Sequence, residues 1–159
     1  MKADAAAGVG DRVDITLRPM TAADLPAVRP LLTQLGYEIE AEEVRSRFLA
    51  VAAAEAHAML VAEVAGEVVG FVHVFARPAL EKPPEAIVQS LVVDTTRRTG
   101  GIGKALMTVV ECWARERGFR SVALTSQVTR DDAHAFYERL GYRNAATSHL
   151  LRKHIGEGK

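Results

Sequence analysis

The sequence has little cysteine, no long apolar runs and no excess of charge of either sign. Its single cysteine, Cys112, excludes a disulfide within the chain. Proteins without disulfides are typical of the reducing cytoplasm, which is therefore the expected location. Because Cys112 lies in a helical pattern between Glu111 and Trp113, we expect a small buried apolar residue, not a nucleophile.

The lack of long apolar runs and of a basic excess argues against a membrane and a nucleic acid as partners. The apolar stretches are short and interrupted by charge, so none could span a membrane. Lysine and arginine number 20, as do aspartate and glutamate, whereas nucleic-acid-binding proteins usually carry a basic excess. The histidines, cysteine and acidic residues show no metal-ligand spacing, so we expect no metal. A polyanionic small molecule is still compatible, because a local basic cluster can bind phosphate without changing net charge.

The 159 residues are 48% hydrophobic and 25% charged, which is typical of one soluble globular domain. Residues 1–11 are rich in alanine and glycine and lack an apolar core of signal-peptide length. We therefore expect a disordered lead-in over residues 1–11, followed by a single domain over residues 12–159.

Hydrophobic periodicity predicts an α/β fold with a mixed sheet, in the order β-α-α-β-β-β-α-β-α-β. Ala65-Gly66 indicates a hairpin, and Gly36, Gly118 and Gly141 are placed to end helices. Strands are expected at 13–17, 59–64, 68–75, 86–93, 119–125 and, from weak signals, within 142–155. Helices are expected at 25–35, 41–55, 101–117 and 129–140.

The stretch from Leu91 to Lys104 joins an apolar strand to a helix through a basic, glycine-rich turn. Glycines permit a tight turn and close approach of a ligand to the backbone. The first N–H groups of a helix have no partner within it, and the helix dipole adds positive potential there. Arg97, Arg98 and Lys104 add full charges. Together these features predict a phosphate or pyrophosphate site.

Two familiar phosphate motifs do not fit this turn. A P-loop requires glycine where Arg98 stands and serine or threonine where Ala105 stands. The dinucleotide fingerprint requires its third glycine where Leu106 stands. What remains is Arg-x-x-Gly-x-Gly, formed by Arg98, Gly101 and Gly103.

A second motif, Ala-His-Ala-Phe-Tyr-Glu-Arg-Leu-Gly-Tyr, covers residues 133–142. With the first motif at this spacing, the chain resembles the GCN5-related N-acetyltransferase superfamily from about residue 13 onward. The resemblance implies a single-domain acyl-CoA N-acyltransferase fold, whose central, mostly antiparallel sheet is flanked by helices. Residues 130–134 also resemble small bacterial members that acetylate small-molecule amines, such as aminoalkylphosphonate or aminoglycoside acetyltransferases.

The resemblance implies direct transfer of an acetyl group from acetyl-CoA to a primary amine. Backbone groups of Leu91, Val92 and Val93 would hold the pantetheine arm and the thioester oxygen. Tyr137 would donate a proton to the leaving thiolate, since a phenol with a pKa of about 10 is protonated at neutral pH. The pyrophosphate would lie on the turn made by Arg98, Thr99, Gly100, Gly101, Ile102, Gly103 and Lys104.

On the acceptor side, many family members carry a glutamate on the strand before the turn. This chain has Gln89 and Ser90 there, which can orient an amine or a water but are not bases. Glu85, at the start of this strand, is a candidate base acting through water. The resemblance adds Glu38, because family substrates often bind near the turn between the first two helices. A substrate amine that is partly deprotonated in solution would need no strong base. His73, between two phenylalanines on one strand face, is expected to line the core or the pocket.

Three functions are compatible with these motifs. The leading hypothesis is a small-molecule amine acetyltransferase, which could form a homodimer as many family members do. Acetylation of a protein N-terminus or a lysine uses the same fold. A non-catalytic acyl-CoA sensor would keep Arg98, Gly101 and Gly103 and would not need Tyr137.

Overall fold

The computed structural model describes residues 13–98, 100–126 and 130–157. The chain forms two compact units, Met1–Thr125 and Ser126–Lys159. The predicted lead-in over residues 1–11 lies outside the described residues. The first unit contains β1 (Ile15–Pro19), α1 (Leu25–Leu35), α2 (Ala41–Ala52), β2 (His57–Val64), β3 (Glu67–Arg77), β4 (Glu85–Val93), α3 (Ile102–Glu116) and β5 (Val122–Leu124). The second contains α4 (Asp131–Arg139).

The five strands of the first unit form one sheet in the order β1-β2-β3-β4-β5. The first three neighbouring pairs are antiparallel, and β5 runs parallel to β4. The predicted hairpin joins β2 to β3, and both of its turn residues are left-handed, with φ of 51° at Ala65 and 79° at Gly66. Such turns match the twist of the flanking strands. The mixed, mostly antiparallel sheet predicted from the sequence is therefore confirmed.

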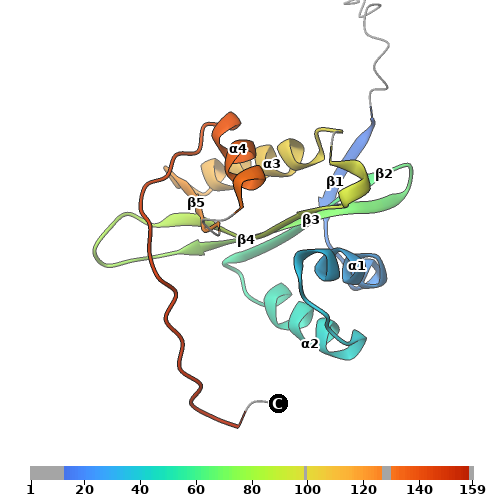
Figure 1. Ribbon diagram of the computed structural model, residues 1–159, viewed down its shortest axis with the longest axis horizontal. Helices are drawn as coiled ribbons and strands as arrows, with labels where there is room; N and C mark the ends of the chain where they lie inside the picture. Colours follow the sequence, from blue (N-terminus) through green and yellow to red (C-terminus); the bar gives the residue numbers. More distant parts are fainter. Residues whose placement is uncertain (1–12, 99, 127–129, 158–159) are drawn as a thin grey trace, which may run out of the picture. The chain divides into compact units, whose positions relative to one another are not determined.

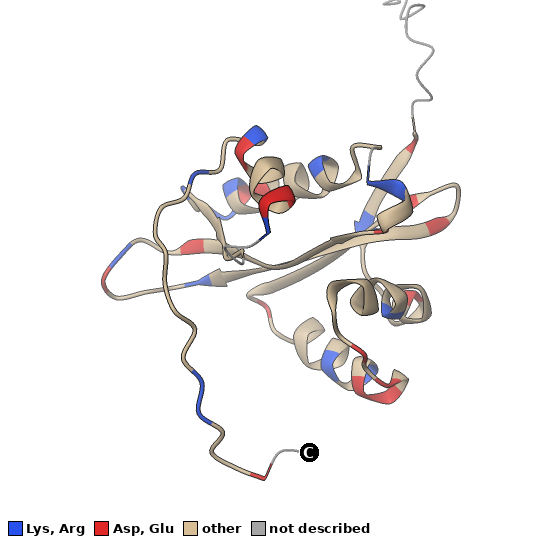
Figure 2. Cartoon of the chain, viewed as in Figure 1, with Lys and Arg blue, Asp and Glu red and all other residues tan. Residues whose placement is uncertain are grey.

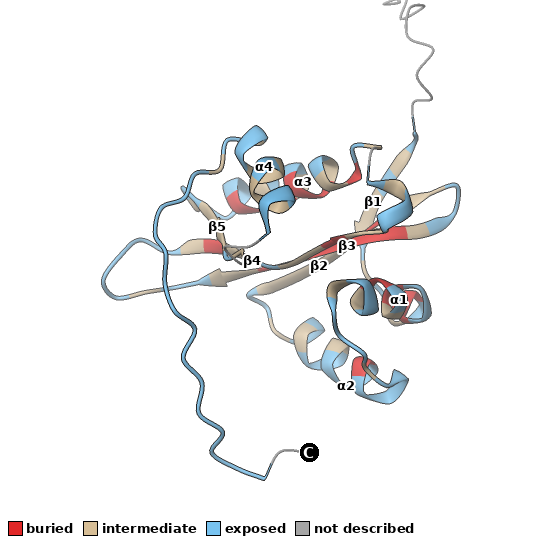
Figure 3. Cartoon of the chain, in the orientation of Figure 1, coloured by how far each residue is buried: buried red, intermediate tan, exposed pale blue. Residues whose placement is uncertain are grey.

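Helices cover both faces of this sheet, with α1 and α2 on one side and α3 on the other (Figure 1). Apolar residues of α1, Val28 and Leu31, form a core cluster with one residue from each of β2, β3 and β4, namely Val61, Phe71 and Val92. On the opposite face, α3 buries one apolar stripe, and buried positions follow both α3 and the central strands (Figure 3). The stripe consists of Ile102, Leu106, Met107, Val110, Trp113 and Ala114.

A buried carboxylate fixes the start of α1. Asp24 is 6% exposed and accepts hydrogen bonds from the Thr21 backbone N–H at 2.7 Å and from both terminal nitrogens of Arg18, at 2.8 and 2.7 Å. The Arg18 guanidinium holds the pKa of Asp24 below its usual value. Arg18 also donates to Glu63 at 2.8 Å. This network ties β1, the first turn of α1 and β2 together.

Four expectations need correction. Residues 142–155 contain no strand, and Leu150, Leu151 and Ile155 are exposed. In a strand, the adjacent residues Leu150 and Leu151 would point to opposite faces. Lys153 would lie between Leu151 and Ile155 on one face, so neither face would be continuously apolar. The strand expected at 119–125 is confined to Val122–Leu124, and the helix expected to reach residue 55 ends at Ala52. Cys112 is exposed, because the buried stripe of α3 passes beside it.

Candidate active site

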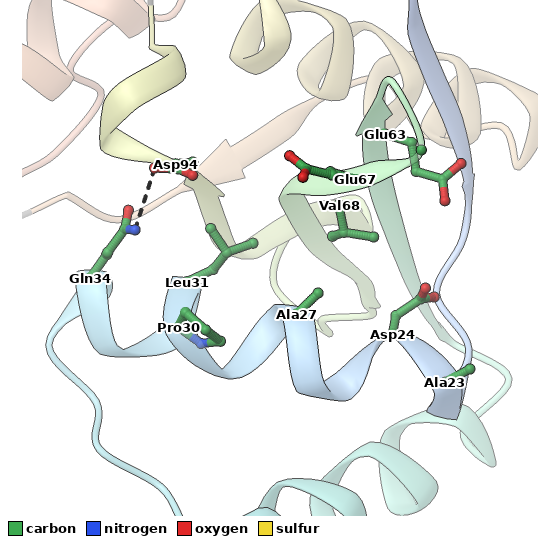
Figure 4. A pocket seen from close by; sticks show the side chains of 11 residues that line it. Ala23, Asp24, Ala27, Pro30, Leu31, Gln34, Glu63, Glu67, Val68 and Asp94 are labelled. Atoms are coloured by element: carbon green, nitrogen blue, oxygen red, sulfur yellow. Dashed lines mark hydrogen bonds between the residues drawn. The ribbon is translucent and has the colours of Figure 1, made fainter.

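The turn after β4 is attached to two neighbouring elements. Asp94 donates its backbone N–H to the Val69 carbonyl at 2.8 Å, and its carboxylate accepts from the backbone and hydroxyl of Thr96, both at 3.1 Å. Gln34, near the end of α1, accepts the Thr95 N–H at 3.0 Å and donates to Asp94 at 3.5 Å (Figure 4). The turn is therefore held against β3 and α1 before it reaches the glycines.

At the start of α3, Gly101 supplies the left-handed residue that lets the chain enter the helix, with φ of 77°. No side chain caps this end of the helix, and no atom lies within 4 Å of the position that a Cβ on Gly101 would take. The first intrahelical donor is the Ala105 N–H, which bonds to the Gly101 carbonyl at 3.0 Å. The N–H groups of Ile102, Gly103 and Lys104 therefore have no helical acceptor, as expected for an anion site.

The basic residues of the turn differ in their partners. Arg97 pairs with Glu67 at 3.0 Å, so its charge is neutralised beside the turn of the β2–β3 hairpin. Arg98 and Lys104 are exposed and make no ion pair within the described part of the chain. Basic positions gather at this end of α3 in Figure 2. Cations at a helix N-terminus are unfavourable unless an anion binds there. Thr99, also expected in the site, lies outside the described residues.

The strand that leads into the turn has an open edge. β5 pairs only with Ala86, Ile87 and Val88 of β4. The next residue, Gln89, is an exposed bulge, because the register with β3 passes from Ser90 directly to Val88. Beyond it, β5 does not pair with the last part of β4, which contains Leu91, Val92 and Val93. Among the described residues, no strand pairs with this edge of Leu91, Val92 and Val93, which were predicted to hold the pantetheine arm.

Two of the predicted acceptor-side residues, His73 and Ser90, lie on the sheet face that α1 and α2 cover. His73 lies on the same face of β3 as the core residue Phe71 and is directly opposite Ser90 of β4. The Nε2 atom of His73 is 2.9 Å from Nδ1 of His57, on β2. Burial and the neighbouring His57 ring lower the pKa of His73 to about 4. The sequence argument missed His57, although pairing the hairpin strands outward from Ala65-Gly66 brings the two histidines close together.

The two candidate carboxylates have different surroundings. Glu85 accepts a hydrogen bond from the Ser121 hydroxyl at 3.0 Å and lies 3.4 Å from Lys82 and 3.5 Å from Arg77. The Ser121 hydrogen bond, followed by Lys82, lowers the pKa of Glu85, which weakens it as a proton acceptor. Glu38 is exposed in the connection between α1 and α2 and makes no ion pair among the described residues.

In the second unit, Tyr137 is half-buried on α4 within a small aromatic cluster. Its ring centroid lies 5.1 Å from that of Phe136 and 5.9 Å from that of Tyr142, both edge to face. Burial raises the pKa of the Tyr137 phenol above its usual value, against an opposing effect of Arg130. Tyr137 therefore keeps its proton at neutral pH, as a general acid must.

A cavity of about 510 Å³ lies between α1, the β2–β3 hairpin and Asp94 (Figure 4). The carboxylates that line it already have partners: Arg18 for Asp24 and Glu63, Arg97 for Glu67, and Thr96 for Asp94. It contains none of the predicted substrate residues. Within the described residues there is no cluster that could hold a metal, and no helix is long and apolar enough to cross a membrane.

Comparison with known proteins agrees with these motifs. Residues 25–142 match the model of the acetyltransferase (GNAT) family. The chain is 30% identical over 132 residues to an aminoglycoside N(6')-acetyltransferase type 1 from Stenotrophomonas maltophilia, which covers 80% of this chain and 85% of that protein. It is 27% identical over 127 residues to the N-acetyltransferase YhdJ of Bacillus subtilis, with coverage of 79% and 88%.

Among solved structures, the aminoglycoside N-acetyltransferase AAC(6')-Iy in complex with CoA superposes with a TM-score of 0.81 at 20% identity. The superposition covers 92% of this chain and 99% of that one, and at this identity it establishes the shared fold. The family match extends over most of the chain and includes both sequence motifs. The chain therefore belongs to the acetyltransferase (GNAT) family and is an acyltransferase.

Proposed function

We propose that residues 12–159 act as one cytoplasmic enzyme domain that transfers an acetyl group from acetyl-CoA to a primary amine of a small molecule. The observation that carries this proposal is the start of α3. There, N–H donors without helical acceptors, a left-handed glycine and two cations that make no ion pair with any described residue converge on one turn. Such an end is suited to a pyrophosphate and is poorly stabilised without one.

The chain's own residues fit acetyl-CoA in two places. Arg98, Lys104 and the N–H groups of residues 101–104 would bind the pyrophosphate, and Gly101 leaves room for it because no side chain occupies that position. The open edge of β4 at Leu91, Val92 and Val93 would accept the amide groups of the pantetheine arm as a neighbouring strand would. Bound in this way, acetyl-CoA supplies an acyl group activated as a thioester.

The remaining chemistry is assigned to Tyr137. The acceptor amine attacks the acyl carbon directly, and the Tyr137 phenol gives its proton to the departing sulfur. A raised pKa supports this role, because the phenol stays protonated until the sulfur becomes negative. A sensor that only bound acyl-CoA would have no use for such a group.

The class of acceptor is supported by the family members that this chain resembles. The relative from Stenotrophomonas maltophilia, matched over 80% of this chain, is named as an aminoglycoside N(6')-acetyltransferase. We infer that the acceptor here is also a primary amine on a small polar molecule. Protein N-termini and lysine side chains are the rival acceptors within the same fold.

A thiol-release assay tests the proposal. The purified chain is incubated with acetyl-CoA and a panel of aliphatic diamines, aminoglycosides, amino sugars and short peptides with a free N-terminus or lysine. We expect amine-dependent release of coenzyme A with at least one small molecule and acetylation of its amine by mass spectrometry. Turnover only with peptides would replace the proposed acceptor class. Tight acetyl-CoA binding without turnover on any amine would instead favour the sensor.

A further inference from the structure

We propose that His73 and His57 form a two-histidine relay that removes the proton from the acceptor amine, in place of the carboxylate that β4 lacks. This inference rests on the proposed function. The carrying observation is that the Nε2 atom of His73 and the Nδ1 atom of His57 are 2.9 Å apart on neighbouring strands. A hydrogen bond of this length aligns the two rings for transfer of a proton from one to the other.

The free nitrogen of His73 is accessible. In the part of the chain that the structure describes, Nδ1 of His73 has no hydrogen-bond partner. In the same part of the chain, no side-chain nitrogen that lacks a partner is fully buried. Because Nδ1 of the half-buried His73 lacks a partner, this atom is accessible to solvent. One nitrogen of His73 is therefore committed to His57, and the other is available to an incoming amine.

The position of His73 on the sheet places it beside the expected reaction point. Ser90, its partner on β4, is three residues before Val93, about 10 Å along the strand from the pyrophosphate turn. The bulge at Gln89 interrupts β4 at this level, and β5 leaves the edge open beyond Val88. An acyl arm that follows the open edge back from the turn thus brings its thioester toward Ser90 and His73.

Other residues hold the pair in place. His57 stacks on Phe75, with ring centroids 5.1 Å apart and planes inclined by 16°. Its backbone N–H donates to the Ala54 carbonyl at 3.1 Å, which anchors the start of β2 to the end of α2. Two rings fixed in this way lose little further freedom when a proton moves between them.

Several charged groups on the elements around β3 have partners of their own, and Glu42 and Arg45 of α2 are exposed. On β4, Glu85 is bound by Ser121 and Lys82; on α1, Arg29 donates to the Ile39 carbonyl at 3.1 Å; on β2, Glu63 pairs with Arg18. On α2, whose buried residue is Val44, Glu43 pairs with Arg47 on an exposed part of the helix. On the sheet itself, within the described residues, Glu63 and Glu85 are thus held by other groups, whereas the two imidazoles bond only to each other.

The proton balance is as follows. The amine nitrogen forms a bond to the acyl carbon as the bond from that carbon to sulfur breaks. The proton lost by nitrogen passes to Nδ1 of His73, and the proton on Nε2 of His73 passes to Nδ1 of His57. The leaving sulfur takes a proton from Tyr137, as in the proposed function. Solvent then removes the proton from His57 and restores that of Tyr137. Because the low pKa of His73 makes this ring alone a weak base, the second ring is required.

The relay is tested with His73→Gln and His57→Gln, which keep hydrogen-bonding side chains but accept no proton. The matched control is His149→Gln, an exposed histidine outside the sheet. We expect kcat/KM to fall about 100-fold in both relay variants, a typical loss on removing a general base. The Kd for acetyl-CoA is expected to stay within twofold of wild type, as is the turnover of the control.

The pH profile distinguishes a relay from a packing role. The substrate amine is protonated throughout the acidic range, and in the wild type His73 also gains a proton as the pH falls through its lowered pKa of about 4. The slope of log kcat/KM against pH should therefore steepen from near one to near two around pH 4, and should stay near one in His73→Gln, where only the amine titrates. Histidine ring NMR of the full chain, followed over pH, should show the His73 signals moving in His57→Gln if the rings are coupled.

The outcomes are separable. If the wild type turns over while both variants keep its kcat/KM and its acidic slope, the relay is wrong and the proposed function stands. If the wild type releases no thiol with any amine, the proposed function fails and the relay fails with it. A variant that loses activity through misfolding is recognised by its lost acetyl-CoA binding. In that case uncoupled ring titrations in the wild type would refute the relay.

Discussion

At the scale of single residues, we propose that the donor half of the reaction depends on Arg98. Arg98 is exposed beside a helix N-terminus and has no ion pair within the described residues, whereas Arg97 is held by Glu67. The two arginines are adjacent in the sequence and carry the same charge. Only their contacts show that Arg97 is neutralised by Glu67, whereas Arg98 is available for a phosphate.

Arg98→Ala should weaken acetyl-CoA binding. A charge-assisted hydrogen bond to phosphate contributes about 1.5–3 kcal/mol, so calorimetry should show the Kd rising by roughly 10- to 100-fold. Arg115→Ala, an exposed position near the far end of the same helix, serves as the control and should bind as the wild type does. Wild-type affinity in Arg98→Ala would place the pyrophosphate elsewhere.

Tyr137→Phe removes the proposed acid and little else, because the aromatic contacts with Phe136 and Tyr142 are those of the ring. We expect kcat to fall by about one to three orders of magnitude, as on loss of a general acid, with acetyl-CoA binding retained. Steady-state kinetics with the best amine of the panel measures this. Unchanged kcat would exclude Tyr137 as the acid.

At the scale of elements, the turn after β4 is shaped by contacts with α1. The Gln34 side chain joins the end of α1 to the Thr95 N–H and to Asp94. Gln34→Ala removes these bonds without touching the phosphate-binding groups. We expect the protein to lose about 1 kcal/mol of unfolding free energy, the usual value of one such bond. Acetyl-CoA affinity should also fall a few-fold as the turn loosens. Thr33→Ala, one residue earlier on the exposed side of α1, serves as the control.

The packing of α3 on the sheet depends on Gly70. A Cβ at this position would lie 2.8 Å from the Val92 carbonyl oxygen and 3.3 Å from Cδ1 of Leu106. The oxygen belongs to a central strand and cannot move cheaply. Gly70→Ala should therefore destabilise the fold by about 2 kcal/mol, within the range for overpacked cores, as measured by urea unfolding. Gly156→Ala, where nothing lies within 4 Å, should have no effect.

At the scale of the whole molecule, the titration of His73 makes stability depend on pH. The fold lowers the pKa of His73 to about 4 from its ordinary value of 6.5, so the unfolded chain binds more protons between these values. The stabilisation is complete above pH 6.5 and is lost as the pH falls through 4. The lowered pKa values of Asp24, Glu85 and Asp94 act in the same direction but in a more acidic range.

Urea unfolding at pH 7 and pH 5 measures this dependence. Allowing for the exposed part of the ring, His73 should account for about 1 kcal/mol of the stability lost between these two values. His73→Gln should remove that share, and the exposed His149→Gln should not. Equal losses in the two variants would mean that the imidazole of His73 is not held neutral by the fold.

Most of the architecture could be predicted from the sequence alone, and the proposed donor half of the site also rests on sequence motifs. Alternation and helical spacing located the hairpin at Ala65-Gly66 and the amphipathic helix after Gly101, because these patterns are local and strong. Charge and glycine content likewise marked residues 98–104, since an anion site at a helix N-terminus is built from consecutive residues.

Contacts between residues that are distant in the sequence became visible only in the tertiary structure. Glu67 forms an ion pair with Arg97, Ser121 and Lys82 bind Glu85, and two histidines 16 residues apart share a hydrogen bond. The strand predicted from propensity within residues 142–155 was wrong, because a strand needs a pairing partner and a continuous apolar face. Pairing across a sheet is set by register and bulges, which no local pattern of residues specifies.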